Sequence, residues 1–148
     1  LIINVGQMKQ TEYEERLLEW SNFRKSLEAS NDPLQDVIDY YNQFPQVSIH
    51  TDPYSKETWP DPWELIHENE YCEYCILLGM CYTLQLTDRF SGVKFEIHIT
   101  LDEDNSHHYY LLHVGDRVLG YNKEKHINAT EIKQNLISQS VFQMPARQ

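Results

Sequence analysis

The sequence predicts an α+β domain in which N-terminal helices and a buried central helix pack on a small antiparallel sheet. Two patterns carry this prediction. Apolar residues recur at helical spacing up to about residue 87, whereas residues 93–122 alternate between apolar and polar side chains with the period of two that strands have. Helices that precede strands, rather than alternating with them, are typical of α+β proteins. A chain of 148 residues has the length of one domain.

Two helices are expected in residues 1–44. The pattern Thr11-x-x-Glu14 is a capping box, and it introduces an amphipathic helix over about Glu12–Ala29. A second helix follows, with Asn31 or Asp32 as its cap and Pro33 in its first turn. The apolar residues that this second helix buries are Leu34, Val37, Ile38 and Tyr41.

A proline-rich loop and the central helix come next. Three prolines make a long helix improbable over residues 45–61, where a short extended piece at Val47–His50 is expected. The central helical part covers residues 62–87, with a first turn at Pro62 and the main helix over about Glu70–Thr87. Because that helix is apolar on most of its surface, it is expected at the centre of the core.

The sheet is expected over residues 93–122. Its strands are predicted at about 93–101, 109–114 and 117–121, joined by polar turns. Residues 128–148 are expected to form a short helix, capped by Asn128 or Thr130 and ending near Ile137, followed by a tail.

The charge of the chain is concentrated in its helical half. The net charge is −11; residues 1–85 hold 5 basic and 15 acidic residues, a balance of −10, and residues 86–148 hold 7 and 8, a balance of −1. An acidic surface repels phosphate groups, so nucleic acid and anionic membranes are not expected as partners. A basic protein is the partner that the acidic helices favour.

The cysteine pattern indicates a reducing compartment. Cys72, Cys75 and Cys81 lie within one helical segment, which is unlike a disulfide framework. Cys72-x-x-Cys75 supplies ligand types for zinc, but no second pair follows from a distant segment. We therefore predict no metal site. The five glycines form no phosphate-binding loop, so no cofactor is predicted either.

A cysteine, a histidine and an asparagine follow one another in an order known from catalysis. Cys72 lies near the expected start of the central helix, where the helix dipole favours a thiolate. His108 stands at the start of a strand 36 residues later, and Asn122 lies 14 residues further on, after the next strand. Papain-like and transglutaminase-like enzymes place nucleophile, base and base-orienting group in this order.

Residues 63–123 resemble the transglutaminase-like fold. The segment 73–78, Glu-Tyr-Cys-Ile-Leu-Leu, is similar to Glu-Tyr-Ala-x-Leu-Leu in the family's central helix, and segments 108–112 and 118–122 are similar to its histidine and aspartate strands. The resemblance implies Cys72, His108 and Asn122 as catalytic residues.

Two departures argue against catalysis. The family's cysteine stands two residues before the glutamate, where this chain has Tyr71, and its aspartate is Asn122 here. Cys72 is one residue out of that register, and one helical step rotates a side chain by about 100°. The departures favour a degenerate copy of the fold whose cysteines are core residues.

The aromatic and acidic segment 59–65 is a second candidate site. Trp59, Trp63 and Glu64 are predicted as interaction residues, because tryptophan is enriched at interface hot spots. The alternative is that both indoles fill the core beside the central helix.

A further resemblance covers about residues 39–121. The segments 51–66, 82–87 and 95–99 resemble those of small proteins encoded by large tailed phages of marine cyanobacteria. This resemblance implies a phage product, made in the host cytoplasm and placed in the virion or acting inside the host.

These observations favour a non-catalytic phage structural or accessory protein, bound to other phage proteins in a neck, tail or baseplate. A homo-oligomer within such an assembly is compatible with this function. The first alternative is a small Cys–His hydrolase or acyl-transferase of transglutaminase-like type. The second is an acidic host-takeover factor that binds a basic host protein.

Overall fold

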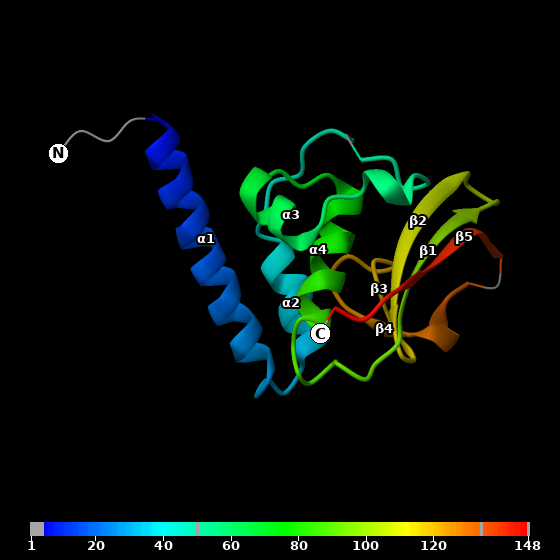
Figure 1. The fold of residues 1–148 in the computed structure, drawn as a ribbon. Coiled ribbons are helices and arrows are strands. Elements are labelled where there is room, and N and C mark those ends of the chain that lie inside the picture. Colours follow the sequence, from blue (N-terminus) through cyan, green and yellow to red (C-terminus); the bar gives the residue numbers. More distant parts are fainter. Residues whose placement is uncertain (1–4, 50, 134, 148) are drawn as a thin grey trace.

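The computed structural model describes residues 5–49, 51–133 and 135–147, with side chains from residue 12 onward within these ranges. Figure 1 shows three layers. Helix α1 (Val5–Leu27) lies along one side, the helices α2 (Pro33–Tyr41), α3 (Pro62–Glu68) and α4 (Glu73–Gln85) form the middle layer, and a sheet closes the other side. The predicted α+β class is confirmed.

Five strands in the described part of the chain form one antiparallel sheet in the order β4-β3-β2-β1-β5. They are β1 (Phe95–Asp102), β2 (His107–Val114), β3 (Arg117–Leu119), β4 (Ile127–Asn128) and β5 (Leu136–Met144). One face of the sheet, with Ile97 and Leu112, joins the main core around α4. The opposite face, with Leu111 and Val118, supports a smaller cluster beneath residues 121–136.

The first helix begins earlier than predicted. Its backbone is helical from Val5, so the expected start at the Thr11 capping box is wrong. Residues such as Met8 and Lys9 before that box are good helix formers, and the helix continues through them. No helix in the described residues is long and apolar enough to cross a membrane.

The second helix confirms its prediction. The Asp32 side chain accepts a hydrogen bond from the Gln35 N–H at 3.2 Å and caps the helix, and Pro33 occupies its first turn. The four apolar residues predicted to be buried, Leu34, Val37, Ile38 and Tyr41, are all in the core.

The central helical part consists of two helices rather than one long helix. Helix α3 ends at Asn69, which has a left-handed backbone (φ 53°), and α4 starts afresh after Cys72. As predicted, α4 is central to the core, since 11 of its 13 residues are buried. The break between the helices decides where the side chain of Cys72 is placed.

The loop over residues 45–61 contains a short 3-10 turn, Lys56–Thr58. Gln46 forms an isolated parallel bridge with Tyr71, and the Val47 N–H donates to the Tyr71 carbonyl at 3.0 Å. Residues 47–49 form no longer strand, and the last residue of the predicted extended piece, His50, lies outside the described residues.

The predicted C-terminal helix is wrong. Asn128 does cap a turn, as expected, but it is the short 3-10 turn Ala129–Glu131, and Leu136–Met144 is then the strand β5. This segment pairs along the whole of β1, with a bulge between Ile99 and Thr100. Pairing satisfies the free N–H and C=O groups of the β1 edge, a demand that the local sequence does not display.

Two histidines stack on the sheet face opposite α4. The rings of His98 and His113 lie 3.9 Å apart between centroids, and Glu96 is 3.5 Å from His98 Nε2. Burial, together with the neighbouring His98, lowers the pKa of His113 from 6.5 to about 4, although Glu96 opposes this shift. The folded protein therefore favours the neutral ring.

This pair predicts a loss of stability in mild acid. Because the folded-state pKa of His113 is depressed, its contribution is present above about pH 6.5 and is lost as the pH falls toward 4. The substitution His113→Gln should reduce the fall in unfolding free energy between pH 7.5 and pH 5 by about 1–2 kcal/mol, allowing for partial exposure. Urea unfolding at both pH values measures this difference. His107→Gln, at an exposed position, is the control, and equal falls for wild type and His113→Gln would contradict the prediction.

Candidate functional site

Cys72 lies at the N-terminal end of α4. Its backbone is extended (φ −76°, ψ 170°), and its carbonyl accepts the first helical hydrogen bond, from the Ile76 N–H at 3.0 Å. The residue is the N-cap of the helix and is completely buried. The thiol is therefore held at the positive end of the helix dipole, as the sequence predicts.

Two further residues belong to this site: Cys75 in the first turn of α4, which interacts with Cys72, and Thr51 in the proline-rich loop, which contacts Cys75. A hydrogen bond to Cys72, reinforced by burial, raises the pKa of the Cys75 thiol far above its ordinary value. The side chains of Cys75 and Cys72 therefore interact directly, with the Cys75 thiol on the protonated side of the pair. Thr51 Oγ1 lies 3.2 Å from Cys75 Sγ and opposes that pKa shift. These three residues connect the proline-rich loop to the start of α4.

Tyr110 is the β2 residue that faces this end of α4. Its ring packs edge-on against Tyr74 with centroids 5.3 Å apart. Burial raises the pKa of Tyr110, and electrostatic interactions with neighbouring acidic groups, Glu73 first among them, add to this effect. Sequence reasoning did not identify Tyr110 and Thr51 as site residues, and it considered Cys75 only as a zinc ligand or a core residue. The signal available for Tyr110 was its place in the strand, two residues after the predicted base.

The other two predicted catalytic residues, His108 and Asn122, have different surroundings. His108 belongs to the same face of β2 as Tyr110 but is exposed, whereas Cys72 is fully buried. Asn122 lies in the loop after β3, where its Oδ1 accepts a hydrogen bond from the Glu124 N–H at 2.8 Å. Asn122 and Tyr110 line one groove, and His108 is not among the residues of its lining.

The groove runs beside α4, between α2 and the end of β3. It has an aliphatic floor, made by Ile38, Ile76, Leu77 and Met80, and a polar rim, made by Asn42, Gln46, Glu73, Asn122 and Lys123. An ion pair of 3.2 Å between Lys123 and Glu73 crosses the rim next to Cys72. The groove can therefore receive an apolar group, but Cys72 is buried and is not among the residues that line it.

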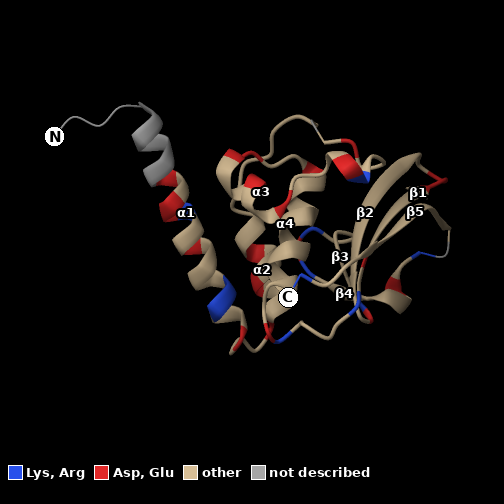
Figure 2. Cartoon of the chain, in the orientation of Figure 1, with Lys and Arg blue, Asp and Glu red and all other residues tan. Residues whose placement is uncertain are grey.

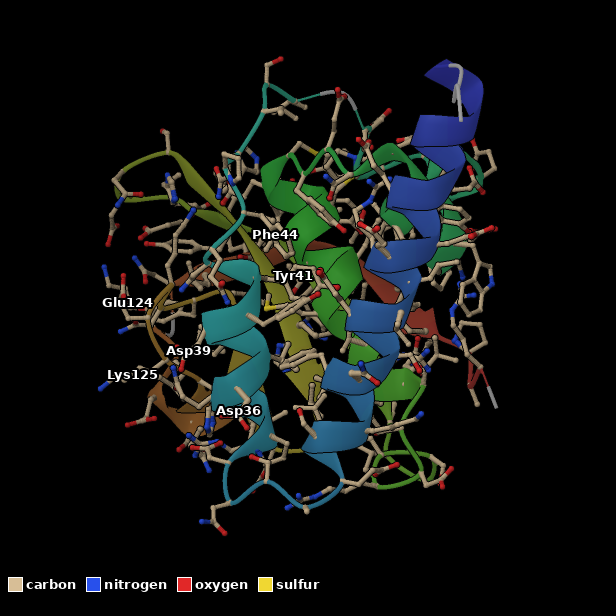
Figure 3. The ribbon with its side chains drawn as sticks, turned by 90° about the vertical axis from the view of Figure 1, so that its left-hand side faces the viewer. Asp36, Asp39, Tyr41, Phe44, Glu124 and Lys125 are labelled. Carbon is tan, nitrogen blue, oxygen red and sulfur yellow. The ribbon has the colours of Figure 1, made fainter. Side chains whose placement is uncertain are left out.

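The loop after β3 is fixed to α2 by side chains that bind backbone carbonyls. Gln35 Nε2 donates to the Glu124 carbonyl at 2.7 Å, and Asn42 Nδ2 donates to the Lys123 carbonyl at 2.9 Å. Figure 3 shows Glu124 and Lys125 beside α2, on the side that carries Asp36 and Asp39. This contact sets the width of the groove.

The aromatic–acidic segment divides between core and surface. Trp59 is partly buried and packs against Tyr74 and Phe142, whereas 47% of Trp63 is exposed. Glu64 completes a capping box with Asp61 at the start of α3. Trp59 thus follows the core alternative, and Trp63 lies at the surface.

No group of three or more His, Cys, Asp or Glu residues among those described could hold a metal ion. Cys81, the third cysteine, is buried in the core, and burial raises the pKa of its thiol. All three cysteines are free thiols.

The fold, an α+β arrangement of helices on an antiparallel sheet, is shared with a solved structure. The chain is similar to the solved structure of calcium-bound LapG from Legionella pneumophila, with a TM-score of 0.64 and 19% sequence identity. The match covers 93% of this chain and 81% of LapG. No protein-family model and no curated protein matches the sequence.

Calcium does not fit the described residues of this chain. A calcium ion takes 6–8 oxygen ligands, most of them carboxylates or carbonyls. The residues flanking Cys72 offer one carboxylate, that of Glu73, which Lys123 already neutralises. We therefore derive no chemistry through calcium.

The prediction of a non-catalytic phage structural protein is wrong. The match to LapG covers almost the whole chain, whereas the phage resemblance receives no support. The prediction failed because it treated Cys72 as part of a helix, where one step turns a side chain by about 100°. Cys72 instead precedes the helix on an extended backbone, so a helical register does not apply to it.

A glycine at the end of β3 allows the chain to pass close to the backbone of Tyr110 on β2. Gly120 has a φ of 99°, and a Cβ at this position would lie 2.3 Å from the Tyr110 carbonyl oxygen. Any other residue would add a backbone clash to a strained conformation.

Gly120→Ala should therefore lower the free energy of unfolding by about 2–4 kcal/mol. Chemical denaturation measures the change. Gly92→Ala is the matched control, because a Cβ there meets nothing within 4 Å. Similar stabilities of the two variants would contradict the close approach of Gly120 to Tyr110.

Proposed function

We propose that the protein is a small hydrolase or acyl-transferase of the transglutaminase-like type, with Cys72 as its nucleophile. The observation that carries the proposal is the position of Cys72 at the start of the buried helix α4, within a fold shared with LapG. The groups around this thiol supply the rest of the proposed chemistry.

Three local features support a nucleophilic role for Cys72. The positive end of the α4 dipole stabilises a thiolate there. The Cys75 thiol, which stays protonated, donates a hydrogen bond that stabilises the same sulfur. The first N–H groups of α4 have no partner within the helix and can stabilise an oxyanion formed beside Cys72.

The reaction follows from these groups. The Cys72 sulfur attacks the carbonyl carbon of an amide or ester, and the tetrahedral oxyanion lies against the helix N–H groups. When the carbonyl re-forms, the bond to the leaving amine or alcohol breaks, and the leaving group takes the proton that the base removed from the Cys72 thiol. Water then attacks the thioester in a hydrolase, or an amine does so in an acyl-transferase, and the thiol is released.

His108 is the proposed base, and Asn122 its proposed orienting group. His108 shares the face of β2 that carries Tyr110, the residue beside Cys72. The buried state of Cys72 requires a movement before substrate reaches it. Thr51 connects the proline-rich loop to Cys75, so displacement of this loop is the expected opening step.

The proposal predicts a stoichiometric thioester at Cys72. Native protein incubated with p-nitrophenyl acetate should release nitrophenolate and gain one acetyl group at Cys72, located by peptide mass spectrometry. Cys72→Ala should abolish the adduct, and Cys81→Ala should leave it unchanged. His108→Ala should slow acetylation by about 10² or more.

The controls distinguish an activated thiol, Cys72, from an equally buried thiol without that activation, Cys81. Acetylation is measured after thermal melts have shown that each variant is folded. Acetylation of Cys72 no faster than that of Cys81 in native protein would overturn the proposal. An unchanged Cys72 rate in His108→Ala would overturn base catalysis by His108.

The Cys75 donor predicts a separate effect. Cys75→Ala removes the hydrogen bond that favours the ionised form of the Cys72 sulfur. The pH midpoint for alkylation of Cys72 by iodoacetamide should therefore rise by about one unit or more. An unchanged midpoint would show that the Cys75 thiol does not support the charge on Cys72.

A further inference from the structure

A hollow between α1 and α3 combines aromatic rings with carboxylates. It is lined by Tyr13, Trp63, Glu64, His67 and Glu68, which we call the aromatic–acidic pocket. It lies outside the groove beside α4, which has none of these residues in its lining. The function of Cys72 makes no use of these side chains.

Ring contacts fix the aromatic side chains that line the pocket. Trp63 packs edge-on against the buried Trp20, with ring centroids 5.5 Å apart. Tyr13 packs edge-on against His67 with centroids 5.0 Å apart. The aromatic surfaces are therefore fixed before any ligand arrives, which reduces the entropy lost on binding.

Arg16 joins the two helices without adding a donor to the pocket. Its Nε donates to the Ile66 carbonyl and one terminal nitrogen donates to the His67 carbonyl, both at 3.0 Å. These bonds direct the guanidinium to the C-terminal carbonyls of α3. Arg16 is absent from the pocket lining, where the carboxylates are those of Glu64 and Glu68.

The charge around the pocket is complementary to a cation. Figure 2 shows acidic residues on the described turns of α1 and on α3. Residues 1–85 have a balance of −10, against −1 for the rest of the chain. Aromatic faces beside carboxylates bind ammonium and guanidinium groups through cation–π attraction and charge-assisted hydrogen bonds.

We infer that the aromatic–acidic pocket is a docking site for a lysine or arginine side chain on a basic polypeptide segment. The exposed indole of Trp63 and the Tyr13 ring receive the cation, and Glu64 and Glu68 supply the opposite charge. This site does not depend on catalysis by Cys72. Its failure and the failure of the proposed function are therefore distinguishable.

The test uses a fluorescein-labelled peptide of lysines alternating with glycines, titrated with the full chain and followed by anisotropy. The wild type should bind this peptide but not one in which glutamates replace the lysines. Trp63→Ala should weaken binding about fivefold or more, and Trp63→Phe, which keeps a ring, should weaken it less. Tyr54→Ala removes an exposed aromatic ring elsewhere and should have no effect.

A charge-matched pair decides whether the site or the net charge binds. Glu68→Gln and Glu57→Gln change the net charge equally, but only Glu68 lines the pocket. Glu68→Gln should weaken binding more, and the difference should shrink at high salt. Equal effects of the two variants, absence of peptide binding, or binding unaffected by Trp63→Ala would each overturn the inference.

Discussion

The helical half of the protein depends on one buried hydroxyl group, that of Thr83. It donates to the Gly79 carbonyl at 2.7 Å and accepts hydrogen bonds from Trp20 Nε1 and the Tyr41 hydroxyl, both at 2.9 Å. These bonds join α4 to α1 and α2, and they use the one donor and two acceptor positions of a hydroxyl completely. A fully satisfied buried network specifies a single arrangement, because any shift of one helix would leave a polar group without its partner. Figure 3 shows Tyr41 and Phe44 pointing from the end of α2 toward the neighbouring helices, in agreement with this central role.

The position of α4 in turn defines the candidate site. Asn69 ends α3 in a left-handed conformation, so the chain can turn and start α4 after Cys72. The thiol then lies at a helix N-terminus and beneath the loop that carries Thr51. On the sheet side, the close approach of Gly120 to Tyr110 brings the loop with Asn122 against the same end of the helix. The site is therefore assembled from four segments of the chain: the proline-rich loop, the start of α4, the strand β2 and the loop after β3.

The acidic surface and the candidate catalytic groove are physically separate. The groove is mostly aliphatic, and its Glu73 is neutralised by Lys123. The carboxylates of α3 instead lie beside exposed aromatic rings. A single domain thus offers two chemically different surfaces, one suited to an apolar group and one suited to a cation.

Local patterns in the sequence determined those elements whose stability is local. Helix α2 follows from the Asp32 cap, Pro33 and the spacing of its apolar residues, and the apolar composition of α4 already indicates a core helix. The same reasoning found Cys72 at a helix start. It could not find β5, because Leu136–Met144 becomes a strand through hydrogen bonds to the edge of β1, which is distant in the sequence. Nor could it find the distant residues around the two thiols. Thr51, which contacts Cys75, and Tyr110, which packs against Tyr74, reach this region only through the packing of a loop and a strand on α4. Caps, prolines and periodicity act over a few residues, whereas burial and strand pairing depend on which distant segments compete for the same surface. The tertiary structure alone therefore decided the surroundings of the thiol.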